Sequence, residues 1–265
     1  MSHYGGSMPA TELRFATPPV RAVELTFFFD PVPLKLTSLA PLVTQLRERF
    51  PDVIERFARM PWVKDDDPDT GPSFLGEEAE RFPFPWLTFR DNNGHAISFQ
   101  DDRLMLRWQF ETGREYPGYE KLRTDLEREF GAFVANAEEL TSESVVVRRA
   151  RAEYDNSIPD RAAWTVAQRS FSIESDGVMQ PLPGLQGVNS GGLFHFSDEG
   201  SVTHVDFAAF SDEADGSLSL RATTQAQDPE ASVLPFELLD VAHGHLIECF
   251  ATLTTREQQE SWGPQ

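Results

Sequence analysis

Apolar residues recur along this chain with two different periods, and the period changes from one segment to the next. Over residues 103–110 the apolar side chains of Leu104, Leu106, Trp108 and Phe110 alternate with mostly polar ones. A period of two is typical of a β-strand with one buried face. Residues 116–140 then carry apolar side chains at intervals of three and four, which predicts an amphipathic helix. A chain that mixes these periods is expected to combine a sheet with helices.

The same two periods continue on both sides of this strand and helix. Strands are predicted over 13–29, 86–90, 96–100, 144–158, 164–174, 193–197, 202–210 and 217–226, and helices over 36–57 and 234–254. Asn93-Gly94 predicts a hairpin turn because both residues tolerate positive φ. Pro51 interrupts the first helix, so a kink or a restart is expected after Phe50. The predicted fold class is α+β, with two similar halves, each an antiparallel sheet with long helices packed on one face.

Three regions are expected along the chain. Residues 1–12 are predicted to be a disordered tail, 13–160 the first α+β half and 161–265 the second half, packed together as one globular unit. Residues 60–85 contain five prolines and two acidic clusters, which indicates an irregular excursion at the surface.

The composition supports a folded protein in a reducing compartment. With 265 residues, 40% of them hydrophobic and 21 of them Phe, the chain can fill a substantial core. A single cysteine, Cys249, excludes an intramolecular disulfide, and its place in an apolar helix predicts an inert buried thiol. Because the chain shows neither a membrane-spanning apolar run nor a signal-peptide pattern at residues 1–30, a cytoplasmic location is expected.

Negative charge is concentrated in the second part of the sequence. The 23 basic and 43 acidic residues give a net charge of −20; up to Arg151 the balance is 19 − 25 = −6, and beyond it 4 − 18 = −14. This charge disfavours general nucleic-acid binding. An acidic surface can serve solubility alone, or it can attract a basic protein partner. For the second case Asp212, Glu213 and Asp215 are the predicted partner-binding residues.

The polar residues that are best organised lie on two neighbouring predicted strands. His195 and His204 flank the turn at 198–200, and Asp206 follows on the same face of its strand as His204. Pairing of these strands would bring the two histidines within several ångströms of each other. They are the predicted ligand-binding residues; the alternative is a set of cross-strand polar pairs on an exposed sheet face.

The sequence contains few other residues in the patterns of catalytic, metal-binding or phosphate-binding sites. His243 and His245 are two residues apart on a predicted helix, so their rings diverge and do not form a metal-binding pair. The chain has no phosphate-binding glycine loop, nucleophile elbow or zinc-protease helix. No catalytic residue, metal ion or cofactor is therefore predicted, and the oligomeric state is left open.

Several short motifs resemble those of a known group of proteins. These are Phe50-Pro51, the helix start Tyr116-Pro117-Gly118-Tyr119, the strand end Tyr154-Asp155-Asn156-Ser157-Ile158, and Trp262-Gly263 after the last helix. With them the chain resembles a sporadically distributed family of uncharacterised bacterial α+β proteins. The chain departs from the family pattern where Arg148, Arg149 and Arg151 precede Glu153 rather than an arginine. The resemblance implies a shared architecture without an assigned activity, so no site residue can be transferred.

Three kinds of function remain. The first is a non-enzymatic binding module, such as an immunity, antitoxin or phage-defence accessory protein, whose acidic surface binds a basic protein. The alternative is a small-molecule-binding protein or enzyme with a pocket between sheet and helices that His195, His204 and Asp206 would line. A docking role of residues 60–85 in a larger assembly is a third option.

Overall fold

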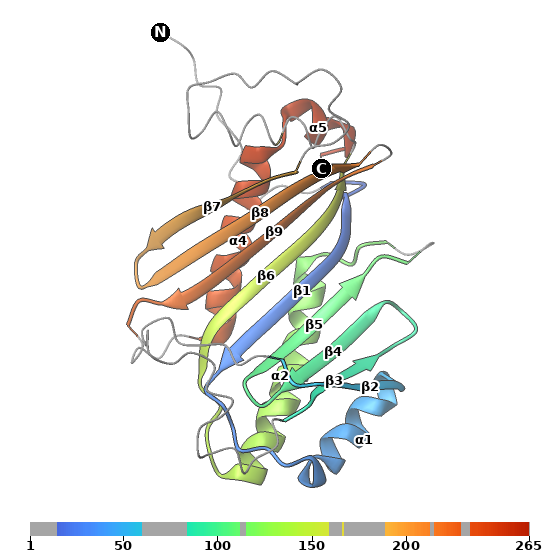
Figure 1. Cartoon of the computed structure of the whole chain (residues 1–265), viewed down its shortest axis with the longest axis vertical. Coiled ribbons are helices and arrows are strands. Elements are labelled where there is room, and N and C mark those ends of the chain that lie inside the picture. Colours follow the sequence, from blue (N-terminus) through green and yellow to red (C-terminus); the bar gives the residue numbers. More distant parts are fainter. Residues whose placement is uncertain are drawn as a thin grey trace. The chain divides into compact units, whose positions relative to one another are not determined.

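The computed structural model describes residues 15–59, 84–111, 115–158, 166, 189–212, 215–228 and 234–264. Its strands are β1 (Val20–Phe29), β2 (Asp52–Arg56), β3 (Trp86–Arg90), β4 (His95–Gln100), β5 (Arg103–Gln109), β6 (Val147–Ile158), β7 (Asn189–Asp198), β8 (Ser201–Asp212) and β9 (Asp215–Ala226). Its helices are η2 (Leu36–Ser38), α1 (Ala40–Arg49), α2 (Tyr119–Thr141), α4 (Pro235–Leu253) and α5 (Arg256–Ser261) (Figure 1). The predicted tail at 1–12 and residues 60–83 of the predicted excursion lie outside the described residues. So does the predicted strand 164–174, except for Val166, which is helical.

All nine strands belong to one antiparallel sheet in the order β2-β3-β4-β5-β1-β6-β9-β8-β7. Two meanders, β3-β4-β5 and β7-β8-β9, end beside β1 and β6 respectively. The predicted fold of two halves, each with its own sheet and long helices on one face, is therefore wrong. In separate sheets, β1 and β6 would each present an edge of unpaired backbone groups; as neighbours, the two strands satisfy each other's hydrogen bonds. The periodicity of a strand shows which face is buried but not which strand lies beside it.

The chain forms two compact units, and β1 and β6 contribute residues to both. Unit 1 comprises Met1–Glu24, Arg114–Tyr116 and Arg149–Gln265, and unit 2 comprises Leu25–Gly113 and Pro117–Arg148. Each unit combines strands with at least one helix, so each has its own set of buried side chains.

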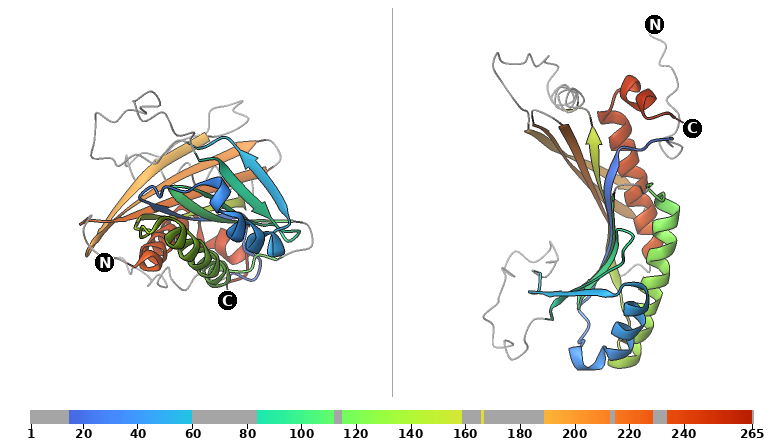
Figure 2. Two further views of the ribbon diagram at one scale, coloured as in Figure 1. Left: turned by 90° about the horizontal axis from the view of Figure 1, so that it is seen from below. Right: turned by 90° about the vertical axis from the view of Figure 1, so that its right-hand side faces the viewer.

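In unit 1, α4 packs against β9 and β8 (Figure 2). The side chains that point from these strands toward the helix are buried, namely Thr203, Val205, Phe207 and Ala209 of β8 and Leu218, Leu220, Ala222 and Thr224 of β9. The helix contributes Leu239, Leu246 and Leu253, which recur every seven residues along one face. Alternation along the strands thus leaves their other side chains on the opposite face of the sheet.

In unit 2, α2 packs against β5 and also contacts α1. Aromatic rings fill this core: the ring centroids of Phe27 and Phe130 are 4.8 Å apart, and those of Phe29 and Phe133 are 5.4 Å apart. Phe99 joins them at 5.5 Å from Phe133. These pairs tie β1 and β4 to the helix.

The first predicted helix is shorter than expected. It is helical from Ala40 to Arg49, and after Pro51 the chain forms the strand β2, which pairs with β3. Phe50 has φ −125° and ψ 79°, away from helical values, as expected for the residue before a proline. The apolar spacing after Pro51 is therefore part of a strand and not of a restarted helix.

None of the helices in the described part of the chain is both long enough and apolar enough to cross a lipid bilayer.

Candidate functional site

The side of the unit 1 sheet that faces away from α4 carries mostly polar side chains. We call this side the open face. Its rows of directly opposed residues are Arg151, Thr223, His204 and His195 in one row, Glu153, Arg221, Asp206 and Leu193 in the next, and Arg149, Gln225, Val202 and Ser197 in the third. All of these side chains are exposed or half-buried. The open face therefore presents charged and titratable groups to the solvent.

His195 and His204 lie opposite each other on β7 and β8, as the sequence predicts. Their Nδ1 atoms are 3.3 Å apart, and their ring centroids are 4.5 Å apart with the planes at 80°. The two Nδ1 atoms form a hydrogen bond, in which one ring donates and the other accepts. The hairpin brings the pair together because the turn at 198–201 sets the register between the strands.

Asp206 belongs to the neighbouring row. It lies opposite Arg221 on one side and Leu193 on the other. Arg221 donates to the Glu153 carboxylate through Nε at 2.7 Å and Nη2 at 2.9 Å, and this bond holds the pKa of the guanidinium above its ordinary value. The predicted ligand-binding residues thus form two groups. His195 and His204 are a pair, whereas Asp206 lies beside Arg221 in the next row.

The histidine pair is on the face away from α4. Phe196, one residue along β7, stacks on His245 of α4 at 4.1 Å between ring centroids, so its neighbour His195 points to the other side. His195, His204 and Asp206 therefore do not line a pocket between the sheet and α4.

Two of the predicted partner-binding residues lie at the facing ends of β8 and β9. Asp212 ends β8 and pairs with Asp215 at the start of β9, while Glu213 lies outside the described residues.

A polar cluster under the sheet in unit 1 was not expected from the sequence. The hydroxyl oxygens of Tyr116 and Tyr154 are 3.0 Å apart, and the ring of His243 lies 5.8 Å from that of Tyr154. Burial lowers the pKa of His243 to about 4, against a smaller opposing effect of the Asp240 charge, and burial raises the pKa of Tyr116. Both effects favour neutral side chains, which suit a structural position inside the unit.

His245, two residues further along α4, has charged neighbours instead. Its Nε2 lies 2.6 Å from Asp198 Oδ2 and its Nδ1 lies 3.1 Å from Glu248 Oε2. This contact ties the helix to the turn between β7 and β8. His243 and His245 therefore have different neighbours, the ring of Tyr154 for His243 and two carboxylates for His245.

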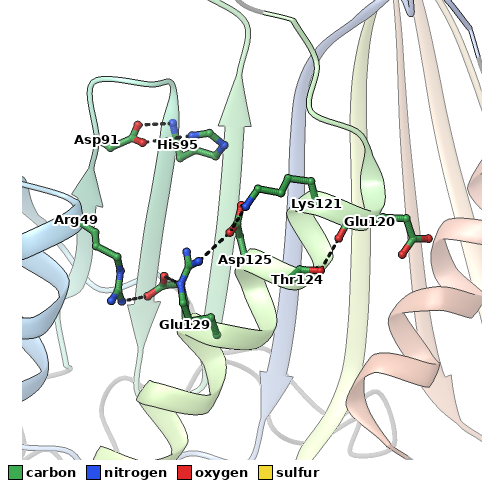
Figure 3. Close-up of polar contacts among 9 residues, drawn as sticks. Arg49, Asp91, His95, Glu120, Lys121, Thr124, Asp125 and Glu129 are labelled. Carbon is green, nitrogen blue, oxygen red and sulfur yellow. Dashed lines mark hydrogen bonds and ion pairs between the residues drawn. The ribbon is translucent and has the colours of Figure 1, made fainter.

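In unit 2, an ion network joins α1 to α2 (Figure 3). Arg49 donates to the carboxylate of Glu129, which is fully buried, and Arg128 Nε donates to the same group at 2.9 Å. The carboxylate of Asp125, one turn earlier, accepts from Lys121 at 2.7 Å and is also near Arg128 at 3.1 Å. The spacing of charges along α2 does not show in the sequence that Asp125 and Glu129 are buried.

The outer side of α4 is strongly acidic. Glu237, Asp240 and Glu248 are exposed and fall within one arc of the helix, and no Lys or Arg occurs anywhere in its 19 residues. The exposed Glu257 and Glu260 continue the acidic series on α5. We call these five residues the acidic surface.

Among the described residues, no three His, Cys, Asp or Glu side chains come together in a group that could hold a metal ion. Cys249 is buried, and burial raises the pKa of its thiol to about 12.

The sequence was compared with protein-family models and with curated proteins, and neither comparison found a match. The resemblance to the bacterial α+β family therefore stays a prediction.

Proposed function

We propose that this chain is a non-enzymatic binding module, of the immunity, antitoxin or phage-defence accessory type, that uses its acidic surface to bind a basic protein in the cytoplasm. The observation that carries the proposal is that the outer side of α4 has exposed carboxylates, while the helix contains no Lys or Arg. The sequence beyond Arg151 has a net charge of −14, so this helix belongs to the most acidic part of the chain.

The physical role of such a surface is to raise the rate of encounter and to reject partners of the wrong charge. Electrostatic steering can raise association rates by roughly tenfold to a thousandfold, and the effect falls as salt screens the charges. Three carboxylates of the acidic surface have titratable or basic neighbours: Glu260 pairs with Arg256, Glu248 with His245, and the Asp240 charge acts on His243. We therefore expect the steering effect to come from the exposed carboxylates together, with Asp212, Glu213 and Asp215 as further predicted contacts.

The test is salt-sensitive capture of a basic protein. The immobilised chain is exposed to the proteins of its source cell and to the purified products of adjacent genes, at low and at high salt. We expect a basic protein that is retained at low salt and released at high salt. A triple variant, Glu237→Gln, Asp240→Asn and Glu248→Gln, should reduce its association rate by at least about tenfold.

A matched control removes the same number of charges from unit 2. Glu120, Glu127 and Glu139 are exposed on α2, and their replacement by Gln should leave binding unchanged. If the partner associated with the triple variant at the wild-type rate, the proposal would be refuted. An equal loss of association rate in the α2 control would refute it as well.

A further inference from the structure

The geometry points to a zinc-binding site on the open face of unit 1, in which His195 Nδ1 and His204 Nδ1 are two ligands of one ion. The remaining coordination positions would be filled by water or by a group from a bound molecule. This inference is independent of the proposed function, since the acidic surface lies on the helices and the histidine pair lies on strands.

The distance between the two nitrogen atoms matches this chemistry. Zn–N bonds are about 2.0–2.1 Å long and zinc in proteins is usually tetrahedral, so two nitrogen ligands of one ion lie about 3.3–3.4 Å apart. A right angle at the metal, as in square-planar copper or nickel sites, would bring them to about 2.9 Å. The observed separation of 3.3 Å, now that of a hydrogen bond between the rings, is close to that of a tetrahedral pair. The ring centroids are 4.5 Å apart in a T-shaped arrangement, so a rotation of the side chains would turn both Nδ1 lone pairs toward one ion.

The sheet holds both histidines in place. β8 is paired with β7 from Ser201 to Phe210 on one side and with β9 along its whole length on the other. On the far side of β8 and β9, the hydroxyl oxygens of the buried Thr203 and Thr224 are 2.7 Å apart, so the strands beneath the site are bonded through side chains as well. Little backbone ordering would then be needed when a metal binds. On metal binding, the ring that now carries its proton on Nδ1 would carry it on Nε2 instead, through exchange with water, so that both Nδ1 atoms can bind the ion.

The charges around the pair allow a cation. In the same row, Arg151 Nε donates to Thr223 Oγ1 at 3.1 Å, and in the next row Arg221 is held by Glu153. On this face the carboxylates of Glu153, Asp155 and Asp206 offset the guanidinium groups of Arg149, Arg151 and Arg221, and the whole chain has a net charge of −20. The open face therefore does not repel a divalent ion in the way that an arginine row alone would.

The ligand set also indicates which ions bind. Two imidazoles suit zinc and neighbouring transition metals, whereas magnesium and calcium prefer oxygen ligands. No third protein ligand joins the pair among the described residues, so the affinity should be weaker than that of a closed structural zinc site.

The test is a titration of the full chain with Zn²⁺, followed by calorimetry and by competition with a chromophoric chelator. We expect one ion per chain, no competition from Mg²⁺, and a loss of at least about tenfold in affinity in both His195→Gln and His204→Gln, since each removes one of two protein ligands. Titration with Co²⁺ should give the visible absorption of a tetrahedral ion in the wild type and not in these variants.

His95→Gln is the control, because this histidine lies in unit 2 beside Asp91 and its loss should leave Zn²⁺ affinity unchanged. Circular dichroism confirms that each variant is folded before titration. Absence of Zn²⁺ binding by the wild type would overturn the inference, as would wild-type affinity in both histidine variants.

Discussion

Replacing His243 with Gln should make the stability of the protein less sensitive to acid. The ring lies beside Tyr154 on the inner side of α4, and desolvation lowers its pKa from 6.5 to about 4. In the unfolded chain the ring takes up a proton below about pH 6.5, but in the folded protein it resists protonation until about pH 4. Its contribution to stability is therefore complete above pH 6.5 and is lost as the pH falls toward 4.

The size of the effect follows from the two pKa values. Between about pH 7.5 and pH 5, a group with an unfolded pKa of 6.5 and a folded pKa of about 4 lowers the free energy of unfolding by at most about 2 kcal/mol. His243→Gln keeps a polar side chain but removes the titration. The variant should thus lose about 2 kcal/mol less than the wild type over this range, whatever its stability at neutral pH.

Urea unfolding at both pH values, followed by circular dichroism and by tryptophan fluorescence, measures this difference. His204→Gln, the same substitution on the open face, serves as the control for removing a histidine. If His243→Gln and the wild type lost the same free energy on acidification, the reasoning from burial would be refuted. An NMR titration of the His243 ring provides a direct check, with no protonation expected at pH 5.5.

Other predictions concern the ion network, a turn and the thiol. Arg49→Met should destabilise the protein by about 3 kcal/mol because it removes a partner of the buried Glu129, and urea unfolding should show much of this recovered when Glu129→Met is added; an equal or larger loss in the double variant would contradict it. Gly94→Ala should cost about 3 kcal/mol, since φ is +80° and a Cβ would clash with a backbone carbonyl oxygen of β5. Gly200→Ala, with similar φ but open space, should cost only about 1 kcal/mol, so equal changes in melting behaviour would refute the steric argument. Cys249 should react with a thiol reagent only after unfolding, because burial raises its pKa to about 12; rapid labelling of the native protein would show the thiol to be accessible.

Local features were predicted well. The alternation over 103–110 is found as β5, with Leu104, Leu106 and Trp108 buried, and the spacing over 116–140 as α2. The hairpin at Asn93-Gly94 is present between β3 and β4, with Gly94 at positive φ. Each of these depends on neighbours within a few residues, which is why the pattern was sufficient.

Contacts between distant residues were predicted less well. The pairing of His195 with His204 could be predicted from the sequence because only a short turn separates the two strands. By contrast, Glu129 and Arg49 are 80 residues apart, and nothing in their local sequence distinguishes this pair from the exposed charges around it. The Tyr116, Tyr154 and His243 cluster was missed for the same reason.

By itself, the sequence determined most of the strands and helices, the two-residue periodicity that separates the faces of each strand, and the concentration of acid beyond Arg151. Only the tertiary structure decided that β1 and β6 are neighbours in a single sheet, that two carboxylates of α2 are buried, and that His195 lies on the face away from α4. The physical reason is that side-chain period depends on the local backbone geometry. Strand order and burial, however, depend on how all elements compete to cover apolar surface and to pair their backbone groups.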